Sequence, residues 1–272
     1  MIRIEEPGGW LLIAHRDHAH LAGQIAAHWN NTEFAAPEPR HDILVAVARH
    51  DDAWAERDAA PLLTREGRPA AFSQELVGRY RGFEAIDLHD YLRVRQRATE
   101  TMAAENPYAA IIVSMHTVNL LTEQTDGATL NPAQREALAR FVTEQCMRQS
   151  QLSSVVGREP ARVPDVEPGR LERAFKFLQV CDSLSLAICV HYPRALVLRH
   201  QHPRRAGALT ELTYTPLGPR RYRVTPWPFD QDELRGTIPA RRISGESFED
   251  VAAFRAAYAT ADRTSAHVVL EK

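Results

Sequence analysis

Lysine is almost missing from this sequence, and neither sign of charge is in clear excess. Only Lys176 and Lys272 occur among 272 residues, so arginine supplies nearly all of the positive charge. The 33 Lys and Arg side chains are balanced by 35 Asp and Glu side chains, which gives a formal net charge of −2. Proteins that bind nucleic acid usually carry a basic excess, so we expect no nucleic-acid partner.

Cysteine and long apolar runs are also scarce. The three cysteines, Cys146, Cys181 and Cys189, are odd in number and lack zinc-like pair spacing, which favours reduced core thiols over a disulfide framework. No run of about 18 apolar residues occurs, so we expect no membrane span. The first residues lack a basic segment followed by an apolar one, which argues against a secretory signal. We therefore expect a cytoplasmic protein.

Several motifs that identify enzyme classes are missing as well. The sequence contains no Gly-rich phosphate loop, no Gly-x-Ser-x-Gly nucleophile motif and no HExxH zinc motif. The 44% of hydrophobic and 25% of charged residues are nevertheless typical of a globular protein, which excludes a disordered or fibrous chain. Any catalytic chemistry must therefore depend on another set of residues.

The pattern of apolar residues favours helices over most of the chain. A hairpin is predicted over residues 1–14, with Pro7-Gly8-Gly9 as its turn. Apolar periodicity and capping residues predict helices near residues 17–29, 41–50, 88–104, 108–122, 131–150 and 170–190. After Pro193 the pattern changes, and it predicts strands at 210–215, 221–225 and 266–270 and a helix at 247–258.

These elements predict a mostly α fold with two parts. Residues 1–195 would form a helical domain, and residues 196–272 a small α/β region at the C-terminal end. The N-terminal hairpin is a candidate addition to the small sheet of that second region.

Three polar side chains, His18, His50 and Asp182, fall on helix faces that are otherwise apolar. The apolar neighbours on these faces are, in the same order, Leu21 with Ile25, Ile43 with Val47, and Leu178 with Leu186. A carboxylate on such a face is destabilising unless it is paired or bound to a cation. Taken singly, each residue has a simpler interpretation, since a lone His is usually a hydrogen-bonded core residue and a lone Asp often links two helices.

The order of these residues resembles the HD domain of metal-dependent phosphohydrolases. His18 is followed by the doublet His50-Asp51 at the end of a helix, and then by Asp182 within a later long helix. The resemblance spans about residues 15–192 and implies a helical bundle in which these four residues bind a divalent ion. More narrowly, an uncharacterised bacterial family of HD-like proteins is similar in the segments DHAHLAGQIA, HDDAW, VSMHTVNL and CDSLSL.

Dinuclear HD proteins use two further histidines, and the resemblance assigns this role to His116 and His89. His116 lies on an apolar helix face, whereas His89 is equally well explained as an exposed residue at a helix start. A mixed set of imidazole and carboxylate ligands suits Fe, Mn, Zn or Mg, and one or two ions would bind. We take Asp51 and Asp58 as the candidate catalytic residues, although Asp58 could instead only cap the loop that follows it.

Two departures from the family pattern bear on function. The doublet is followed by Asp52-Ala53-Trp54, so the phosphate-binding Lys of many dinuclear members is missing, and so is the Gly-Tyr-Pro signature of cyclic-dinucleotide phosphodiesterases. We still expect a metal-dependent phosphohydrolase that acts on a small phosphorylated molecule such as a nucleotide. An HD-fold diiron oxygenase and a non-catalytic, metal-containing ligand sensor are the alternatives, and the sequence leaves self-association into a homo-oligomer open.

Overall fold

The structure is a computed structural model of the 272-residue chain. The structure describes residues 1–73, 77, 87–123, 130–198, 200 and 202–272. None of the helices in these ranges is both long and apolar enough to cross a membrane.

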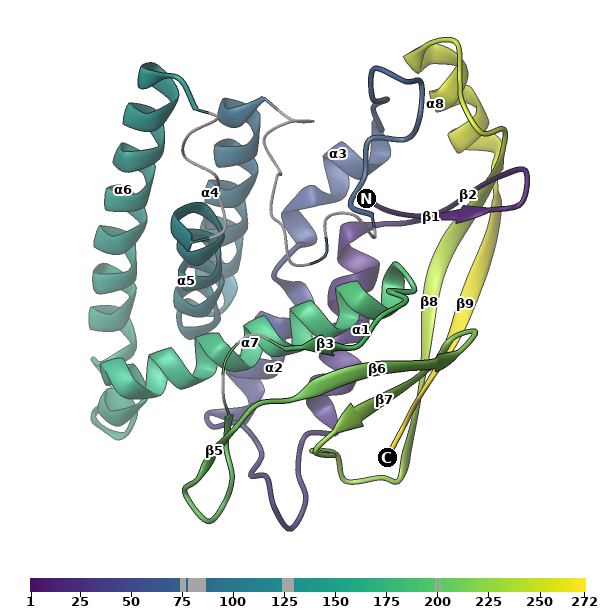
Figure 1. Ribbon diagram of the computed structural model, residues 1–272. Coiled ribbons are helices and arrows are strands. Elements are labelled where there is room, and N and C mark those ends of the chain that lie inside the picture. Colours follow the sequence, from purple (N-terminus) through teal and green to yellow (C-terminus); the bar gives the residue numbers. More distant parts are fainter. Residues whose placement is uncertain (74–76, 78–86, 124–129, 199, 201) are drawn as a thin grey trace.

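Helices α1 to α7 form one group that is packed against a curved sheet, and α8 lies apart from them against the outer part of this sheet (Figure 1). The helices are α1 (His15–Ala27), α2 (Arg40–Arg49), α3 (Ala55–Ala59), α4 (Leu88–Glu105), α5 (Pro107–Glu123), α6 (Pro132–Val156), α7 (Pro168–Cys189) and α8 (Val251–Thr260). Two short 3-10 segments, η1 (Asp52–Trp54) and η4 (Pro160–Val166), follow α2 and α6. In Figure 1, α4, α5 and α6 lie farthest from the sheet, while α1 and α7 lie next to it.

The main sheet combines strands from both ends of the chain. The strands are β1 (Ile2–Glu6), β2 (Gly9–Ile13), β3 (Leu196–Val197), β4 (His202–Pro203), β5 (Leu209–Thr210), β6 (Thr213–Gly218), β7 (Arg221–Thr225), β8 (Glu233–Ser244) and β9 (Asp262–Glu271). Seven of them form one sheet in the order β1-β2-β8-β9-β7-β6-β3, and β4 pairs with β5 separately. All pairs in the large sheet are antiparallel except β7 with β9. Because β2 pairs with β8, the N-terminal hairpin joins the C-terminal strands, as expected.

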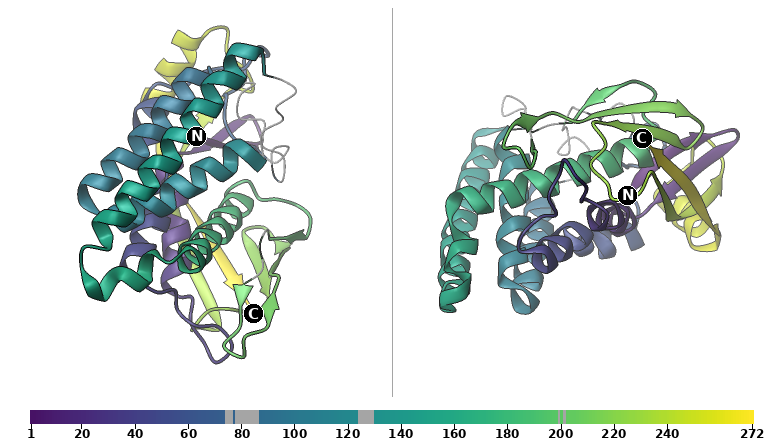
Figure 2. Two further views of the ribbon diagram at one scale, coloured as in Figure 1. Left: turned by 90° about the vertical axis from the view of Figure 1, so that its left-hand side faces the viewer. Right: turned by 90° about the horizontal axis from the view of Figure 1, so that it is seen from below.

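The prediction of a mostly α fold is wrong. Helices make up about half of the described residues, and a curled sheet of seven strands accompanies them, so the fold is mixed α/β. Figure 2 shows from two further sides that this sheet is a full layer of the molecule, not a small appendage. The division into residues 1–195 and 196–272 remains a prediction.

The main cause of this error is β8, a strand of 12 residues that no sequence signal indicated. Its sequence contains Pro239 and several arginines, which are poor signals for a central strand. Proline is tolerated here because β2 pairs only with residues 241–244, which leaves one side of β8 without a partner strand at Pro239. The side chains of β8 alternate between buried and exposed, with Leu234 and Ile238 inside.

Two glycines allow the close packing that positions α1. A Cβ at Gly23 would lie 2.6 Å from the Cβ of Ala48 on α2, so only glycine lets these two helices come this close. A Cβ at Gly236 on β8 would lie 2.7 Å from Leu21, on the other side of α1. The helix is therefore held between α2 and the sheet.

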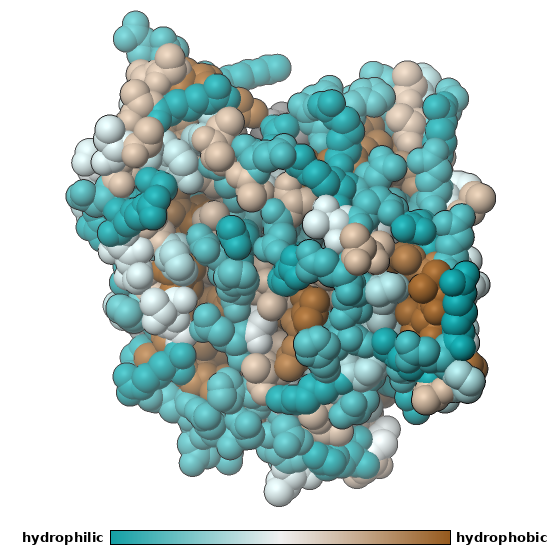
Figure 3. Space-filling view, turned by 180° about the vertical axis from the view of Figure 1, so that it is seen from behind, coloured by the Kyte–Doolittle hydropathy of each residue, from teal (hydrophilic) through white to brown (hydrophobic). Residues whose placement is uncertain are grey.

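The second face of the hairpin is covered by α8. Trp10 and Leu12 on β2 form a small apolar cluster with Ile243 and Phe254, while Leu11 and Ile13 belong to the main core. On the face shown in Figure 3, hydrophilic side chains predominate and apolar ones form small separate patches. The apolar residues are therefore concentrated in the interior.

Candidate metal centre

Five buried side chains from four segments form the candidate centre. Their exposed fractions are 1% for His18 on α1, 0% for His50 and 5% for Asp51 after α2, 1% for His116 on α5, and 7% for Asp182 on α7. They form two overlapping groups that could hold an ion, His18 with His50 and Asp51, and His50 with His116 and Asp182. In each group the ligand atoms lie within 4.8 Å of one another. The structure thus brings together five of the six predicted metal ligands.

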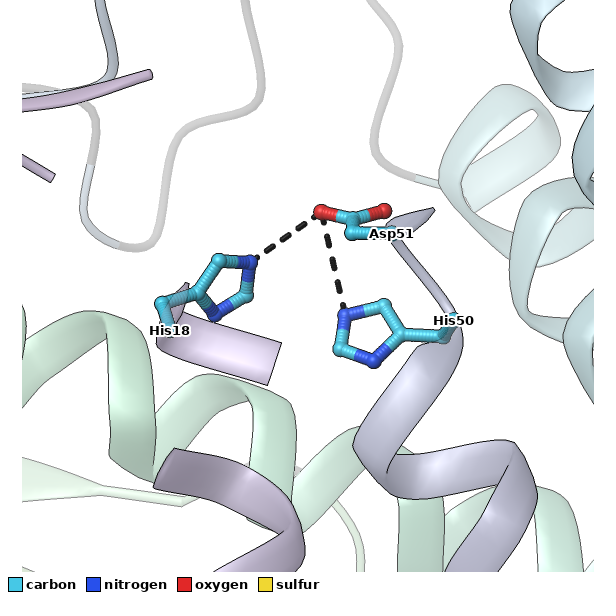
Figure 4. Close-up of side chains that lie close together, drawn as sticks. All are labelled: His18, His50 and Asp51. Carbon is cyan, nitrogen blue, oxygen red and sulfur yellow. Dashed lines mark hydrogen bonds and ion pairs between the residues drawn. The ribbon is translucent and has the colours of Figure 1, made fainter. Parts of the chain in front are cut away.

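The end of α2 explains how two consecutive residues reach the same centre. His50 still has helical backbone angles, whereas Asp51 leaves the helix with φ −112° and ψ 13°. This change of direction turns the Asp51 carboxylate back towards the imidazoles of His18 and His50 (Figure 4). In a continuous helix, adjacent side chains would point about 100° apart.

The two carboxylates lie close to the histidine nitrogens. Oδ2 of Asp51 is 3.1 Å from Nε2 of His18 and 3.8 Å from Nε2 of His50. Oδ1 of Asp182 is 3.3 Å from Nε2 of His50. The Nε2 atom of His50 therefore lies between the two carboxylates.

Hydrogen bonds on the outer side of the rings assign the tautomers of His18 and His50. Nδ1 of His50 is 2.9 Å from the carbonyl oxygen of Val47, so this nitrogen must carry the proton and donate it. Nδ1 of His18 is 3.0 Å from Oγ of Ser185, whose single hydroxyl proton is donated to the Asp182 carbonyl. The serine oxygen therefore accepts from His18. In their neutral forms both rings carry the proton on Nδ1 and present the lone pair of Nε2 to the centre.

The third histidine is held in the same way. Nδ1 of His116 lies 2.9 Å from Oε1 of Gln179, and the amide nitrogen of Gln179 donates to Oδ1 of Asn119 at 2.6 Å. With the glutamine in this orientation, its oxygen can only accept, so Nδ1 of His116 carries the proton. Ligand histidines in metal sites are usually fixed by such a second hydrogen bond.

Three Nε2 lone pairs and two carboxylates in one buried place repel one another unless a cation lies between them. Among the described residues, no group forms a well-aligned hydrogen bond with Nε2 of His50, although this atom is fully buried. A proton or a divalent ion would each supply the missing positive charge. The residues present therefore fit a metal ion with mixed nitrogen and oxygen ligands.

The pKa values reflect the same demand for positive charge. Burial works against a charged His50, but Asp51 and Asp182 outweigh burial and raise the pKa of this histidine to about 9. Burial would raise the pKa values of Asp51 and Asp182, yet the neighbouring histidines lower both, with help from Arg95 in the case of Asp51. Burial lowers the pKa of His116 to about 4, which keeps this ring neutral and able to bind a metal.

Arg95 on α4 belongs to the centre, although we did not predict it. Its guanidinium nitrogen Nη1 lies 2.8 Å from Oδ1 of Asp51, and its Nε donates to the hydroxyl of Tyr91 at 3.0 Å. The guanidinium also lies 5.2 Å from the ring centres of Trp54 and Tyr91. The sequence does contain a signal, because Arg95 is a charged residue on the apolar face of α4 that includes Ala98.

Two predicted site residues lie apart from this cluster. His89 is exposed in the first turn of α4 and belongs to neither group of candidate ligands among the described residues. Asp58 is buried, but its carboxylate accepts hydrogen bonds from the amino group of Met1 and the backbone N–H of His15. His15, which the sequence did not single out, stacks on Trp54 with ring centres 4.6 Å apart.

One family model matches this chain, over residues 1–245, and its description is "Protein of unknown function (DUF3891)". No curated protein and no solved structure matches the chain significantly. The expected similarity to an uncharacterised family is confirmed, and the relation to HD domains remains a prediction. Because the match covers most of the 272 residues, the chain belongs to the DUF3891 family.

Proposed function

We propose that this protein is a metal-dependent phosphohydrolase of the HD type that acts on a small phosphorylated molecule. The main support is the arrangement of His18, His50 and His116. Each ring donates from Nδ1 to a neighbour, which leaves Nε2 as the nitrogen that can bind an ion close to two carboxylates. The order of the ligands along the chain, with the doublet at the end of α2 and Asp182 in the middle of α7, matches the order in HD domains. The ion would be Fe, Mn, Zn or Mg.

The charge of the centre supports an anionic substrate. The two carboxylates and the guanidinium of Arg95 together carry one negative charge, and a divalent ion would change this to one positive charge. A positive centre attracts a phosphate group and favours ionisation of a water molecule. Arg95 also provides a fixed cation beside Asp51 of the doublet. The sequence lacks the phosphate-binding Lys that follows this doublet in many dinuclear HD proteins.

A divalent ion at this centre would act as a Lewis acid on the phosphate and lower the pKa of a water molecule. The protein would hold the ligands in place. Val47, Ser185 and Gln179 fix the ring orientations, and Arg95 fixes Asp51. Burial of all five ligand side chains would exclude bulk water and strengthen each electrostatic interaction.

Asp58 remains a candidate catalytic residue that would act through His15. Its Oδ1 atom is 2.9 Å from Nδ1 of His15, and the rings of His15 and His18 have centres 6.4 Å apart. In this role Asp58 would orient His15, and His15 would carry a proton to or from the reacting molecule.

The test is hydrolysis without oxygen. Protein loaded with Mn²⁺ is incubated anaerobically with a panel of phosphate esters, and release of inorganic phosphate is measured for the wild type and for His50→Ala. We expect at least one ester to be hydrolysed by the wild type and none by the variant. If no ester is hydrolysed and the iron-loaded protein instead takes up O₂ with a substrate, the proposal is wrong and the oxygenase alternative is favoured.

A further inference from the structure

The number of ions in this centre is constrained by the chemistry of His50. An imidazole nitrogen has one lone pair, so Nε2 of His50 can bind only one ion. Both candidate ligand groups include His50, whose other nitrogen is occupied by the carbonyl of Val47. The two groups therefore describe one ion and not two.

The usual route to a second ion passes through the carboxylate of the doublet. In two-metal sites the ions lie about 3.5–4 Å apart, and a carboxylate commonly bridges them with its two oxygens. Here Oδ2 of Asp51 faces His18 and His50, while Oδ1 lies 2.8 Å from Nη1 of Arg95. An ion bound to Oδ1 at about 2.0–2.2 Å would compete with the guanidinium for this oxygen and be repelled by its charge.

Arg95 is held firmly in this place. Its exposed fraction is 4%, its Nε atom donates to Tyr91, and its planar group lies against the rings of Trp54 and Tyr91. An arginine side chain does not lose its proton in proteins, so its positive charge is permanent. His89, the residue expected to help bind a second ion, is exposed at the start of α4, two turns away along the same helix.

We propose that the centre binds a single divalent ion and that Arg95 takes the place of a second one, holding Oδ1 of Asp51 so that this carboxylate binds the ion through Oδ2 alone. Arg95 is thus a positioning residue that acts through Asp51. The inference rests on the metal centre of the proposed function and does not depend on whether a phosphate ester is hydrolysed there. A single-ion centre also argues against the diiron alternative, because Arg95 holds the oxygen of Asp51 through which this carboxylate would bridge two irons.

The first test counts ions. Metal-free protein is titrated with Mn²⁺ while electron paramagnetic resonance measures unbound Mn²⁺. We expect saturation at about one ion per chain and the spectrum of an isolated ion. Two ions per chain, or a spin-coupled pair, would overturn the proposal. This result is independent of whether any phosphate ester is hydrolysed, so a failure of the proposed function leaves the count unaffected.

The second test asks whether Arg95 controls Asp51. Wild type, Arg95→Lys and Arg95→Met are loaded with Co²⁺, whose visible absorption weakens as the number of ligands rises. We expect weaker absorption in Arg95→Met, where Oδ1 of Asp51 is released to bind the ion as well, and near wild-type absorption in Arg95→Lys. Arg97→Met is the matched control, because Arg97 lies on the same helix and pairs with Glu56 at the surface.

An unchanged Co²⁺ spectrum in Arg95→Met would show that Arg95 does not set the binding mode of Asp51 and would overturn that part of the proposal. Circular dichroism establishes that each variant is folded. If Arg95→Met does not fold, Arg95→Gln takes its place. This side chain is polar but uncharged, and an unchanged Co²⁺ spectrum in it would overturn the same part of the proposal.

Discussion

In the helical part of the molecule, charged and polar side chains are buried together, whereas the strands bury apolar ones. Among the described residues, all buried polar and charged side chains except Ser73 and His202 lie in helices or directly after them. The inner face of β8 contains instead Leu234, Ile238 and Ala240. Buried charge is costly, and the helices contain it where an ion can compensate it. The comparison indicates that the helices provide the chemistry and that the sheet supports them.

Removal of the charge of Asp182 should have the largest effect on the helical centre. Asp182→Asn keeps the shape of the side chain but removes one of two anionic ligands. We therefore expect the affinity for Mn²⁺ to fall by about 1,000-fold, more than the 10–100-fold loss typical when a residue that orients a ligand is replaced. Titration calorimetry measures this affinity. If Asp182 only links two helices, the variant will bind Mn²⁺ like the wild type.

An apolar truncation in the sheet should affect stability but not metal binding. Ile238→Ala removes a fully buried side chain of β8, at an expected cost of about 2–5 kcal/mol in the free energy of unfolding. Urea denaturation measures this cost, and the number of ions per folded chain should stay the same. A loss of metal binding in this folded variant would mean that the sheet does more than support α1.

The metal-free protein should lose stability as the pH rises. The pKa of His50 is about 9 in the folded protein, against about 6.5 for a histidine in an unfolded chain. Protonation of His50 therefore contributes about 3 kcal/mol to the free energy of unfolding. This contribution is fully present below pH 6.5 and is lost as the pH rises through 9. Denaturation of metal-free protein at pH 6 and pH 9 measures the change, and His50→Ala should show a much smaller difference. An equal difference in both proteins would assign it to other groups.

Residues that orient the ligands through hydrogen bonds should have smaller effects on the affinity for the metal. Ser185→Ala removes the hydrogen bond that orients His18, so we expect the affinity for Mn²⁺ to fall by about 10–100-fold with little loss of fold. Ser153→Ala is a suitable control, because its hydroxyl donates only to a carbonyl within α6. If both variants bind the metal equally well, Ser185 does not orient a ligand.

The sequence could predict most of the centre because helical periodicity shows which side chains share a face. His18, His50 and Asp182 stood out on apolar faces, and the structure does bring them together. Arg95 was missed because its partner, Asp51, is 44 positions away in the sequence, and no local pattern shows which buried charges meet. His89 was included because of its residue type and position in the chain, and neither indicates which way a side chain points.

The extent of the sheet was much harder to predict. The hairpin at residues 1–14 has an alternating pattern and a Pro-Gly-Gly turn, and it was predicted correctly. In β8 the exposed side chains include arginines, and a proline and a glycine interrupt the pattern, although every second residue from Leu234 to Ala240 is buried. Its partners, β2 and β9, lie at opposite ends of the chain, so local patterns could not reveal the pairing.

The most direct test of this account is the metal content of protein purified without added metal or chelator. Elemental analysis of the wild type and of His50→Ala should find about one transition-metal or magnesium ion per chain in the first and almost none in the second. Folding of the variant is checked by circular dichroism. Wild-type protein that takes up no divalent ion even after incubation with Mn²⁺, Fe²⁺, Zn²⁺ or Mg²⁺, or a His50→Ala variant that keeps the full wild-type amount, would contradict the assignment of this cluster as a metal centre.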